Sequence, residues 1–330
     1  LIMATYKEIK GTQIEVVSSD PSNPVEGQVW YNSTDQVVKG QVLQAADAWA
    51  TSGNLNTGRF YFAGSGIRES AIVTGGEPVA PKGSLSESYN GSTWTETNDL
   101  NTGRQAHAAA GSSNTDGIVF FGYAGPPGNL TATESWNGTS WTAVNSGNTS
   151  RRYLMGDGSA TSALAFGGFS PPWLSITESW NGTNWTEVND LNTARYAGGS
   201  AGSSNTNALT FGGYSTTTLT INESWNGTNW TELGDLNTAR SSNGGSGTNT
   251  SALSYGGDTP GARNETESWN GSAWTETTNL STARGGGGSA GASSASALFA
   301  GGTPVPQAGL TATEEFTGAG TSITRTFTDS

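Results

Sequence analysis

The chain has 330 residues, of which 48 are glycine and 12 are tryptophan, and its formal net charge at pH 7 is −13. It contains no cysteine, which excludes disulfide bonds, thiolate catalysis and cysteine-ligated metals. The negative charge disfavours a nucleic-acid partner, and no run approaches the roughly 20 apolar residues of a membrane span. Regularly spaced tryptophans among short, Gly- and Asn-rich segments argue against disorder and predict an all-β protein.

Residues 1–44 precede the repeated part of the chain and are predicted to form an extension. Residues 27–35 alternate and then turn into Val37-Val38-Lys39, which predicts a β-hairpin. The segment from Gly27 to Ser33 resembles a short Gly-x-x-Trp-Tyr-Asn-Ser/Thr stretch of phage tail-fibre and other virion proteins. Leu1 and Ile2 precede a natural-looking start at Met3, so we expect these two residues to be an artefact.

A repeat of about 45 residues then dominates the sequence, and its first marker is an arginine. The arginine ends a Leu-Asn-Thr-Gly/Ala-Arg motif that is degenerate in the third copy, where Arg152 is taken as its equivalent. Successive arginines are then 45, 48, 43, 45 and 44 residues apart. The repeat arginines are Arg59, Arg104, Arg152, Arg195, Arg240 and Arg284.

Two further markers keep the same period. A glycine pair such as Gly212-Gly213 ends an apolar run, and Gly122-Tyr123 takes its place in the second copy. Two aromatic residues five positions apart follow, such as Trp225 and Trp230, with an Asn-Gly hairpin signal between them. Each period therefore predicts four short strands, and such a sheet can bury its faces only against neighbouring sheets.

The order of these markers resembles the Kelch repeat over about residues 45–318. It appears here as Arg195, the run 209–213, the Glu-Ser-Trp at 223–225, and Trp230. The Ser-, Thr-, Asn- and Gly-rich copies also resemble Kelch-like proteins of marine phages. The resemblance implies a six-bladed β-propeller of four-stranded blades, which we place at residues 45–330 after the extension at 1–44.

Closure of the ring follows from the phase of the repeat. Trp49 matches a fourth-strand tryptophan but has no first three strands before it, whereas the last copy supplies three strands and lacks that tryptophan. The strand near Trp49 is therefore expected to complete the last blade. The alternating stretch 321–327 is the alternative.

Few residues could carry catalysis. His107 is the single histidine and is expected to be packed or to face the channel, which leaves no two-histidine metal site. A glutamate opens the third-strand motif in every copy. A residue that recurs in every blade indicates a structural role, because a catalytic carboxylate pair is needed at only one site. We predict no catalytic, cofactor-binding or metal-binding residues, and hence no enzyme. The recurring glutamates are Glu87, Glu134, Glu178, Glu223, Glu267 and Glu314.

Binding is expected on one face of the propeller. Loops between strands 2 and 3 and between strands 4 and 1 share a face, and they carry most of the variation between copies. Aromatic residues there suit stacking on sugars or docking of a protein, although they could instead fold back onto the blades. The repeat arginines belong to this face, and a structural role is favoured over a ring that binds an anion. The predicted binding residues are Tyr123, Phe169, Trp173 and Tyr214.

The leading functional hypothesis is a structural protein of a phage virion, from its tail, fibre or capsid. Residues 3–44 would bind other virion proteins, and the propeller, present in multiple copies, would bind a host surface glycan or another virion protein. The alternatives are a cellular or secreted, extracellular carbohydrate-binding propeller and, third, a propeller enzyme.

Overall fold

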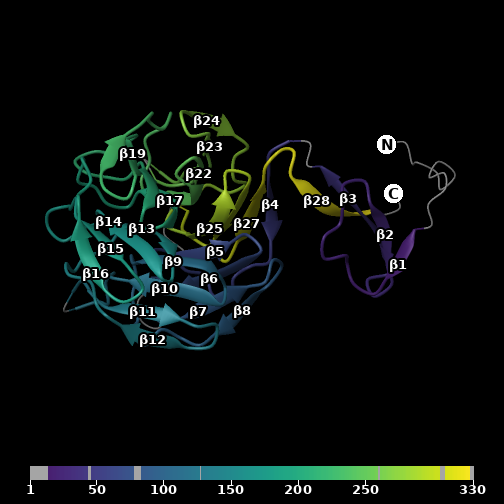
Figure 1. The fold of residues 1–330 in the computed structure, drawn as a ribbon, viewed down its shortest axis with the longest axis horizontal. Coiled ribbons are helices and arrows are strands. Elements are labelled where there is room, and N and C mark those ends of the chain that lie inside the picture. The colour runs from purple at the N-terminus through teal and green to yellow at the C-terminus, as the bar shows by residue number, and fades with distance from the viewer. Residues whose placement is uncertain are drawn as a thin grey trace. The chain divides into compact units, whose positions relative to one another are not determined.

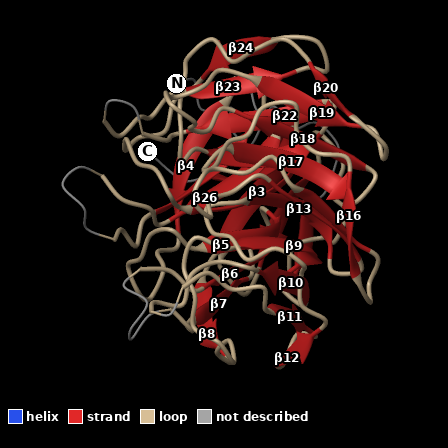
Figure 2. Ribbon diagram, turned by 90° about the vertical axis from the view of Figure 1, so that its left-hand side faces the viewer, coloured by secondary structure: helices blue, strands red, loops and turns tan. Residues whose placement is uncertain are grey.

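The computed structural model describes residues 14–43, 46–77, 83–126, 128–258, 261–304 and 309–327. The regular structure of these residues is β-strand throughout, arranged in seven four-stranded sheets (Figure 2). They include no helix that is long and apolar enough to cross a membrane. The expectation about Leu1 and Ile2 falls outside the described residues.

The chain divides into a larger unit, Ala48–Thr317, and a smaller unit made of Leu1–Asp47 and Gly318–Ser330 (Figure 1). Assigning all of 45–330 to the propeller was therefore wrong at its C-terminal end. Strand β28 (Ser322–Phe327) pairs with β3 (Val37–Leu43) and completes a seventh sheet that the sequence analysis did not predict.

The larger unit holds six sheets, here called blades 1 to 6 in chain order. Blade 1 contains β5 (Ala63–Ile67), β6 (Ser70–Thr74), β7 (Ser86–Tyr89) and β8 (Trp94–Thr97), and blade 2 contains β9 (Ala108–Ser113), β10 (Asp116–Phe120), β11 (Thr133–Trp136) and β12 (Trp141–Val144). Blade 3 contains β13 (Met155–Ser159), β14 (Ser162–Phe166), β15 (Thr177–Trp180) and β16 (Trp185–Val188), and blade 4 contains β17 (Gly199–Ser204), β18 (Asn207–Phe211), β19 (Asn222–Trp225) and β20 (Trp230–Glu232). Blade 5 contains β21 (Gly244–Thr248), β22 (Ser251–Tyr255), β23 (Thr266–Trp269) and β24 (Trp274–Thr277), and blade 6 contains β25 (Gly288–Ser293), β26 (Ser296–Ala300), β27 (Thr313–Thr317) and β4 (Ala48–Ser52).

The six blades form a ring. The first strand of each blade contacts the first strand of the next, in the order β5, β9, β13, β17, β21, β25 and back to β5. These strands lie innermost, while fourth strands such as β12 and β16 lie at the rim (Figure 1). The arrangement is that of a β-propeller.

Blade 6 is completed from the N-terminal side, as predicted. Strand β4 pairs with β27 and places Trp49 opposite Phe316. The Trp49 ring contacts Tyr255 of blade 5 at a centroid distance of 5.1 Å, so it packs between the last two blades. The alternative stretch 321–327 is not part of blade 6.

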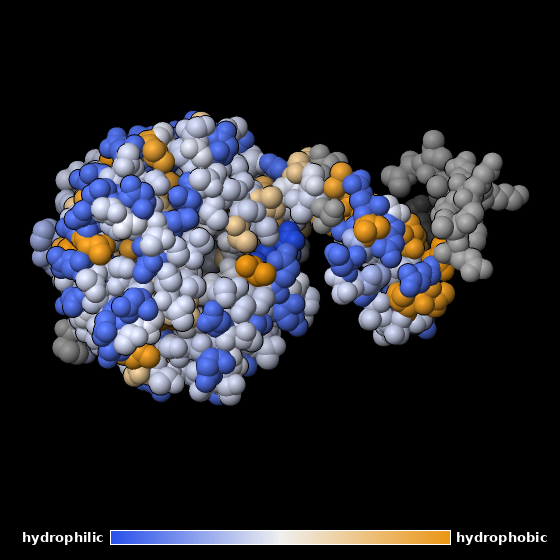
Figure 3. Space-filling model, viewed as in Figure 1, coloured by the Kyte–Doolittle hydropathy of each residue, from blue (hydrophilic) through white to orange (hydrophobic). Residues whose placement is uncertain are grey.

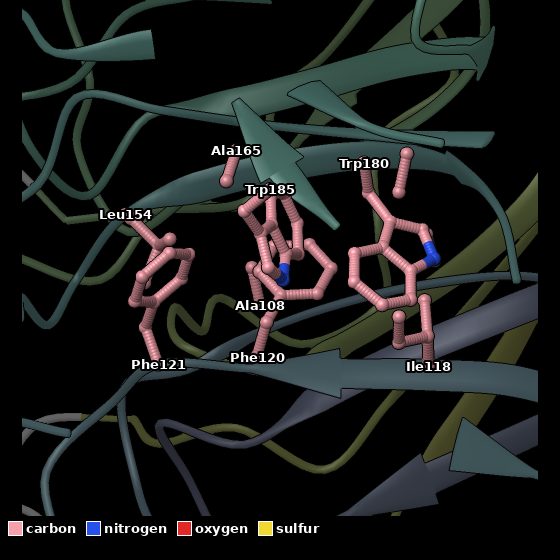
Figure 4. Close-up of a cluster of buried hydrophobic side chains, with 10 residues drawn as sticks. Ala108, Ile118, Phe120, Phe121, Leu154, Ala165, Trp180 and Trp185 are labelled. Atoms are coloured by element: carbon pink, nitrogen blue, oxygen red, sulfur yellow. The ribbon is translucent and has the colours of Figure 1, made fainter. Parts of the chain in front are cut away.

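Aromatic packing between blades forms the core of the larger unit. Between blades 2 and 3, the indole of Trp185 packs against Phe120 and Phe121 (Figure 4). Its Nε1 donates a hydrogen bond of 3.1 Å to Thr133, the first residue of the third strand in the preceding blade. Trp49, Trp94 and Trp230 make the equivalent bond. The aromatic pairs therefore fill the space between blades, as predicted.

The glycine pairs lie where the chain leaves the second strand. Both members of each pair have positive φ, for example +68° at Gly212 and +97° at Gly213, a conformation that favours glycine. In blade 2 the equivalent pair is Phe121-Gly122, with φ of +59° and +99°, and not Gly122-Tyr123 as the sequence analysis aligned it.

The smaller unit contains a sheet of order β1 (Glu15–Val17), β2 (Val29–Asn32), β3 and β28. The predicted hairpin is present as β2 and β3, which pair in antiparallel register. Asp20 accepts hydrogen bonds from Trp30, Asn32 and Lys39. The bond from Lys39 is the main cause that lowers the pKa of Asp20 to about 2.

Candidate binding site on the variable-loop face

The variable-loop face is the face of the propeller that carries the loops between strands 2 and 3 and between strands 4 and 1. Beneath it lies a buried ion pair in every blade. In blade 4 the Arg195 guanidinium lies 2.8 Å from Glu223, and neither side chain is exposed. Burial lowers the pKa of Arg195, and the charge of Glu223 acts in the opposite direction. The equivalent pairs, with distances of 2.5–3.0 Å, are Arg59–Glu87, Arg104–Glu134, Arg151–Glu178, Arg240–Glu267 and Arg284–Glu314.

These pairs hold the Leu-Asn-Thr motif in place. Glu223 also accepts hydrogen bonds from the backbone amides of Asn192 and Thr193 and from the Asn192 side chain. One carboxylate thus fixes both the arginine and the loop that leads into the first strand. This geometry supports the structural role for the arginines, because their guanidinium groups are already paired and buried.

Arg151, and not Arg152, is the arginine of the third repeat. Arg151 is buried and pairs with Glu178, whereas Arg152 lies one position further along, half-buried on the variable-loop face. The degenerate Thr-Ser-Arg-Arg sequence offered two candidates, and spacing alone did not separate them. Assigning Arg152 to the structural set was therefore wrong.

A closed ring of backbone hydrogen bonds lies at the axis of this face. It is formed by the residues two positions after each paired arginine, and each amide donates to the carbonyl of its counterpart in the preceding blade at 2.6–2.8 Å. All six have φ between +51° and +65°. The ring lines a cavity of about 110 Å³. Its members are Tyr61, Ala106, Tyr153, Ala197, Ser242 and Gly286.

Aromatic side chains gather beside this ring. Tyr196 is the centre of the group, with ring centroids of Tyr214 at 5.6 Å, Phe169 at 5.5 Å and Tyr153 at 6.0 Å. Tyr153 in turn meets Tyr61 edge-on at 5.2 Å. All five residues are half-buried, so none is closed off from solvent entirely. We call these residues, together with Tyr123, the aromatic cluster.

Backbone pairing sets these positions. The residue after each paired arginine forms an isolated bridge with the residue after each glycine pair. This bridge joins Arg152 to Phe169 in blade 3 and Tyr196 to Tyr214 in blade 4. The corresponding residues of blades 1 and 5 are acidic, Glu77 and Asp258. The face is therefore aromatic over blades 2 to 4 and acidic at blades 1 and 5.

Three of the four predicted binding residues are brought together. Tyr123, Phe169 and Tyr214 all belong to the aromatic cluster, but Trp173 has no ring contact among the described residues. Its backbone pairs with that of Phe169. The sequence analysis missed Tyr61, Tyr153 and Tyr196. Their signal was available, since each lies one or two residues after a paired arginine, where the copies differ most.

The central channel is lined by small residues of the first strands and has a volume of about 330 Å³. His107 is buried at its wall and lies 2.9 Å from the hydroxyl of Thr74. Burial holds the pKa of His107 well below its usual value. Asp157 also lines the channel, and burial raises its pKa to about 8.

Within the described part of the chain, no three His, Cys, Asp or Glu side chains come together as a metal site would require. On the visible side of Figure 3, the larger unit is mostly hydrophilic or neutral, with hydrophobic residues scattered singly. The aromatic cluster is therefore the group of residues best suited to hold a ligand.

No family model and no curated protein sequence matches the chain. A solved structure titled "Structure of YjhT" is similar to it, with a TM-score of 0.66 and 12% sequence identity. The similarity covers 79% of this chain and 95% of that chain. The shared feature is the propeller fold. At this identity the similarity shows the fold alone.

Proposed function

We propose that this protein is a non-enzymatic component of a phage particle whose Kelch-type propeller binds a carbohydrate on the variable-loop face. The observation that carries the proposal is the aromatic cluster around Tyr196. Tyrosine rings offer an apolar face for a sugar ring and a hydroxyl group for its polar edge. Tyr61 and Tyr153 belong to the closed hydrogen-bond ring, which holds their backbone rigid. A rigid site loses little conformational entropy on binding, and this favours affinity.

The smaller unit supports attachment to another protein. Across its four strands, Val16, Tyr31, Val38 and Phe327 lie side by side in register. Val16 is 68% exposed and Phe327 is 49% exposed. Among the described residues, the strongly exposed large hydrophobic side chains all belong to this unit. Such a row favours burial against a partner. The resemblance of residues 27–33 to virion proteins supports the proposal that this partner is a virion protein.

Carbohydrate binding is tested with the purified full-length protein on an array of bacterial surface glycans. Tyr196→Ala removes the central ring of the cluster and should reduce binding at least about tenfold, because it removes the buried area of the ring as well as about 0.5–1.5 kcal/mol of stacking. Thr228→Ala is the control, since Thr228 is exposed in the strand 3–4 turn on the opposite face. Absence of binding to any glycan would refute the carbohydrate proposal.

The virion assignment is tested separately by imaging particles from the source and looking for the propeller in a repeated density. A match would also show which face is free. Absence from every particle, together with glycan binding, would favour the alternative of a cellular or secreted carbohydrate-binding propeller.

A further inference from the structure

Arg152 stands apart from the other described arginines of the larger unit. Nine arginines are described in that unit, and eight of them form an ion pair with a glutamate. Arg152 is the one described arginine of the unit for which neither an ion pair nor a side-chain hydrogen bond is found. It belongs to a chain with a net charge of −13, in which carboxylates are abundant.

The guanidinium of Arg152 is held by aromatic rings. Its central carbon lies 4.7 Å from the ring centroid of Tyr123, 5.3 Å from that of Phe169 and 5.9 Å from that of Tyr153. Cation–π contacts of this kind fix the side chain and exclude water from its faces while leaving the edge of the guanidinium, which carries the donors, unpaired.

Polar groups without partners surround this arginine. The Nε of Arg152, the Oε1 of Gln105 and the Oδ1 of Asn129 are all buried without a hydrogen-bond partner. They are neighbours, since Tyr123 forms backbone bridges with both Gln105 and Asn129, and the Asn129 amide donates to the carbonyl of Phe169 at 3.2 Å. Buried polar atoms are normally paired. One donor and two acceptors without partners, beside a stacked cation, therefore indicate a site in which a ligand would supply the missing hydrogen-bond partners.

The charges nearby limit the kind of anion. Glu77 and Asp258 lie on the same face at blades 1 and 5, and the whole protein is acidic. A densely charged polyanion would be repelled by this field, whereas a single carboxylate at Arg152 would not. The adjoining rings of Phe169 and Tyr196, 5.5 Å apart, offer a sugar a place to stack beside that carboxylate.

We propose that the ligand is an acidic saccharide whose carboxylate pairs with Arg152 while its sugar rings stack on Phe169 and Tyr196. Gln105 and Asn129 would accept hydrogen bonds from its hydroxyl groups. This inference rests on the proposed carbohydrate-binding function and makes it specific to uronic-acid-containing glycans.

The test uses an array of oligosaccharides that each contain a single galacturonate or mannuronate residue, printed as the free acid and as the methyl ester. The two forms differ in charge and share the same sugar rings. Wild-type protein should bind the acid at least about tenfold more tightly, the usual effect of a charge-assisted hydrogen bond. Arg152→Gln should lose this preference and still bind the ester, whereas Tyr196→Ala should weaken both.

Two controls keep the result interpretable. Arg263→Gln removes a positive charge from the variable-loop face at blade 5, where Arg263 pairs with Glu265, and should retain the preference for the acid. Arg152→Lys keeps the charge and should retain part of the preference, and it replaces Arg152→Gln if that variant melts more than a few degrees below wild type.

The outcomes separate the two proposals. Equal binding of acid and ester by wild type, abolished by Tyr196→Ala, would overturn the role of Arg152 and leave carbohydrate binding standing. Binding of an oligoglutamate peptide, lost in Arg152→Gln, with no binding of any glycan would show that the ligand is an acidic peptide and overturn both proposals.

Discussion

The ring of Phe121 occupies the space above Gly147. A Cβ atom on Gly147 would lie 2.2 Å from two carbons of that ring. In blades 3, 4 and 5 the arrangement is reversed. A glycine follows the second strand, and a leucine four positions before the paired arginine of the next blade packs on it, as Leu191 does on Gly167. At the junction of blades 2 and 3 the large side chain therefore follows the second strand, as Phe121, and the small residue precedes the paired arginine, as Gly147. The same space is filled in both arrangements.

Phe121→Gly and Gly147→Leu should each destabilise the protein, the first by leaving a cavity and the second by overpacking, with costs of about 2–4 kcal/mol. The double variant restores the arrangement of the other blades. It should therefore be more stable than the sum of the single effects by about 1–3 kcal/mol. Urea unfolding of the four proteins measures this coupling, and strict additivity would contradict the exchange.

Ser86→Thr should stabilise the protein by about 1 kcal/mol. Trp141 Nε1 and Ser86 Oγ are both buried without a partner, and they stand where four other blades have a tryptophan donating to a threonine. A threonine at position 86 supplies the acceptor for Trp141, as the equivalent threonines of four other blades do for their tryptophans. The methyl group of threonine is accommodated at the equivalent position in those four blades. Differential scanning calorimetry should show a higher melting temperature. Ser86→Val adds the methyl group without the hydroxyl, and an equal gain in that variant would count against the hydrogen bond.

Asp157→Asn should flatten the dependence of stability on pH. The pKa of Asp157 is raised from 3.8 to about 8 by burial, so between these values the folded protein holds a proton that the unfolded chain releases. Raising the pH through this window therefore destabilises the native state, by at most about 1.4 kcal/mol per pH unit. The positions equivalent to Asp157 in other blades are serine or alanine, such as Ser65 and Ala201.

Thermal melts from pH 4.5 to 8.5 should show the wild type losing stability relative to Asp157→Asn as the pH rises. The comparison removes the general repulsion of an acidic protein, which acts on both. Parallel curves would mean that the native state does not hold this proton.

Glu223→Gln should cost about 3–5 kcal/mol, because it leaves the Arg195 charge buried without its partner. Combining it with Arg195→Met should cost less than the sum of the two changes. Glu232→Gln is the matched control, since Glu232 lies opposite Glu223 in the next strand and is exposed. Equal effects at the two glutamates in chemical denaturation would argue against a structural ion pair.

Much of the fold was predictable because the propeller repeats a local pattern. Glycine pairs, Asn-Gly turns and spaced tryptophans each have a direct backbone or burial reason, and six copies in phase reinforced one another. Even the pairing of Trp49 with the last blade followed from counting strands. The paired glutamates were assigned to architecture for the same reason.

The seventh sheet was not predictable in this way. Strand β28 shows the alternation expected of a strand, but the sequence of a single strand does not identify the strand with which it pairs. Its pairing with β3 joins residues almost three hundred positions apart, and only the folded ring brings the two ends of the repeat together.

The sequence alone determined the repeat unit, the class of fold and the face on which variation concentrates, because these depend on short-range spacing and side-chain type. The tertiary structure decided which of Arg151 and Arg152 is buried. It also decided that Tyr196 contacts Phe169 and Tyr214, and that Tyr153 and Tyr61 extend this group of rings. The physical reason is that burial and ring contacts depend on neighbouring blades. Adjacent arginines are equivalent along the chain and become different only when one faces a glutamate in the core and the other faces aromatic rings at the surface.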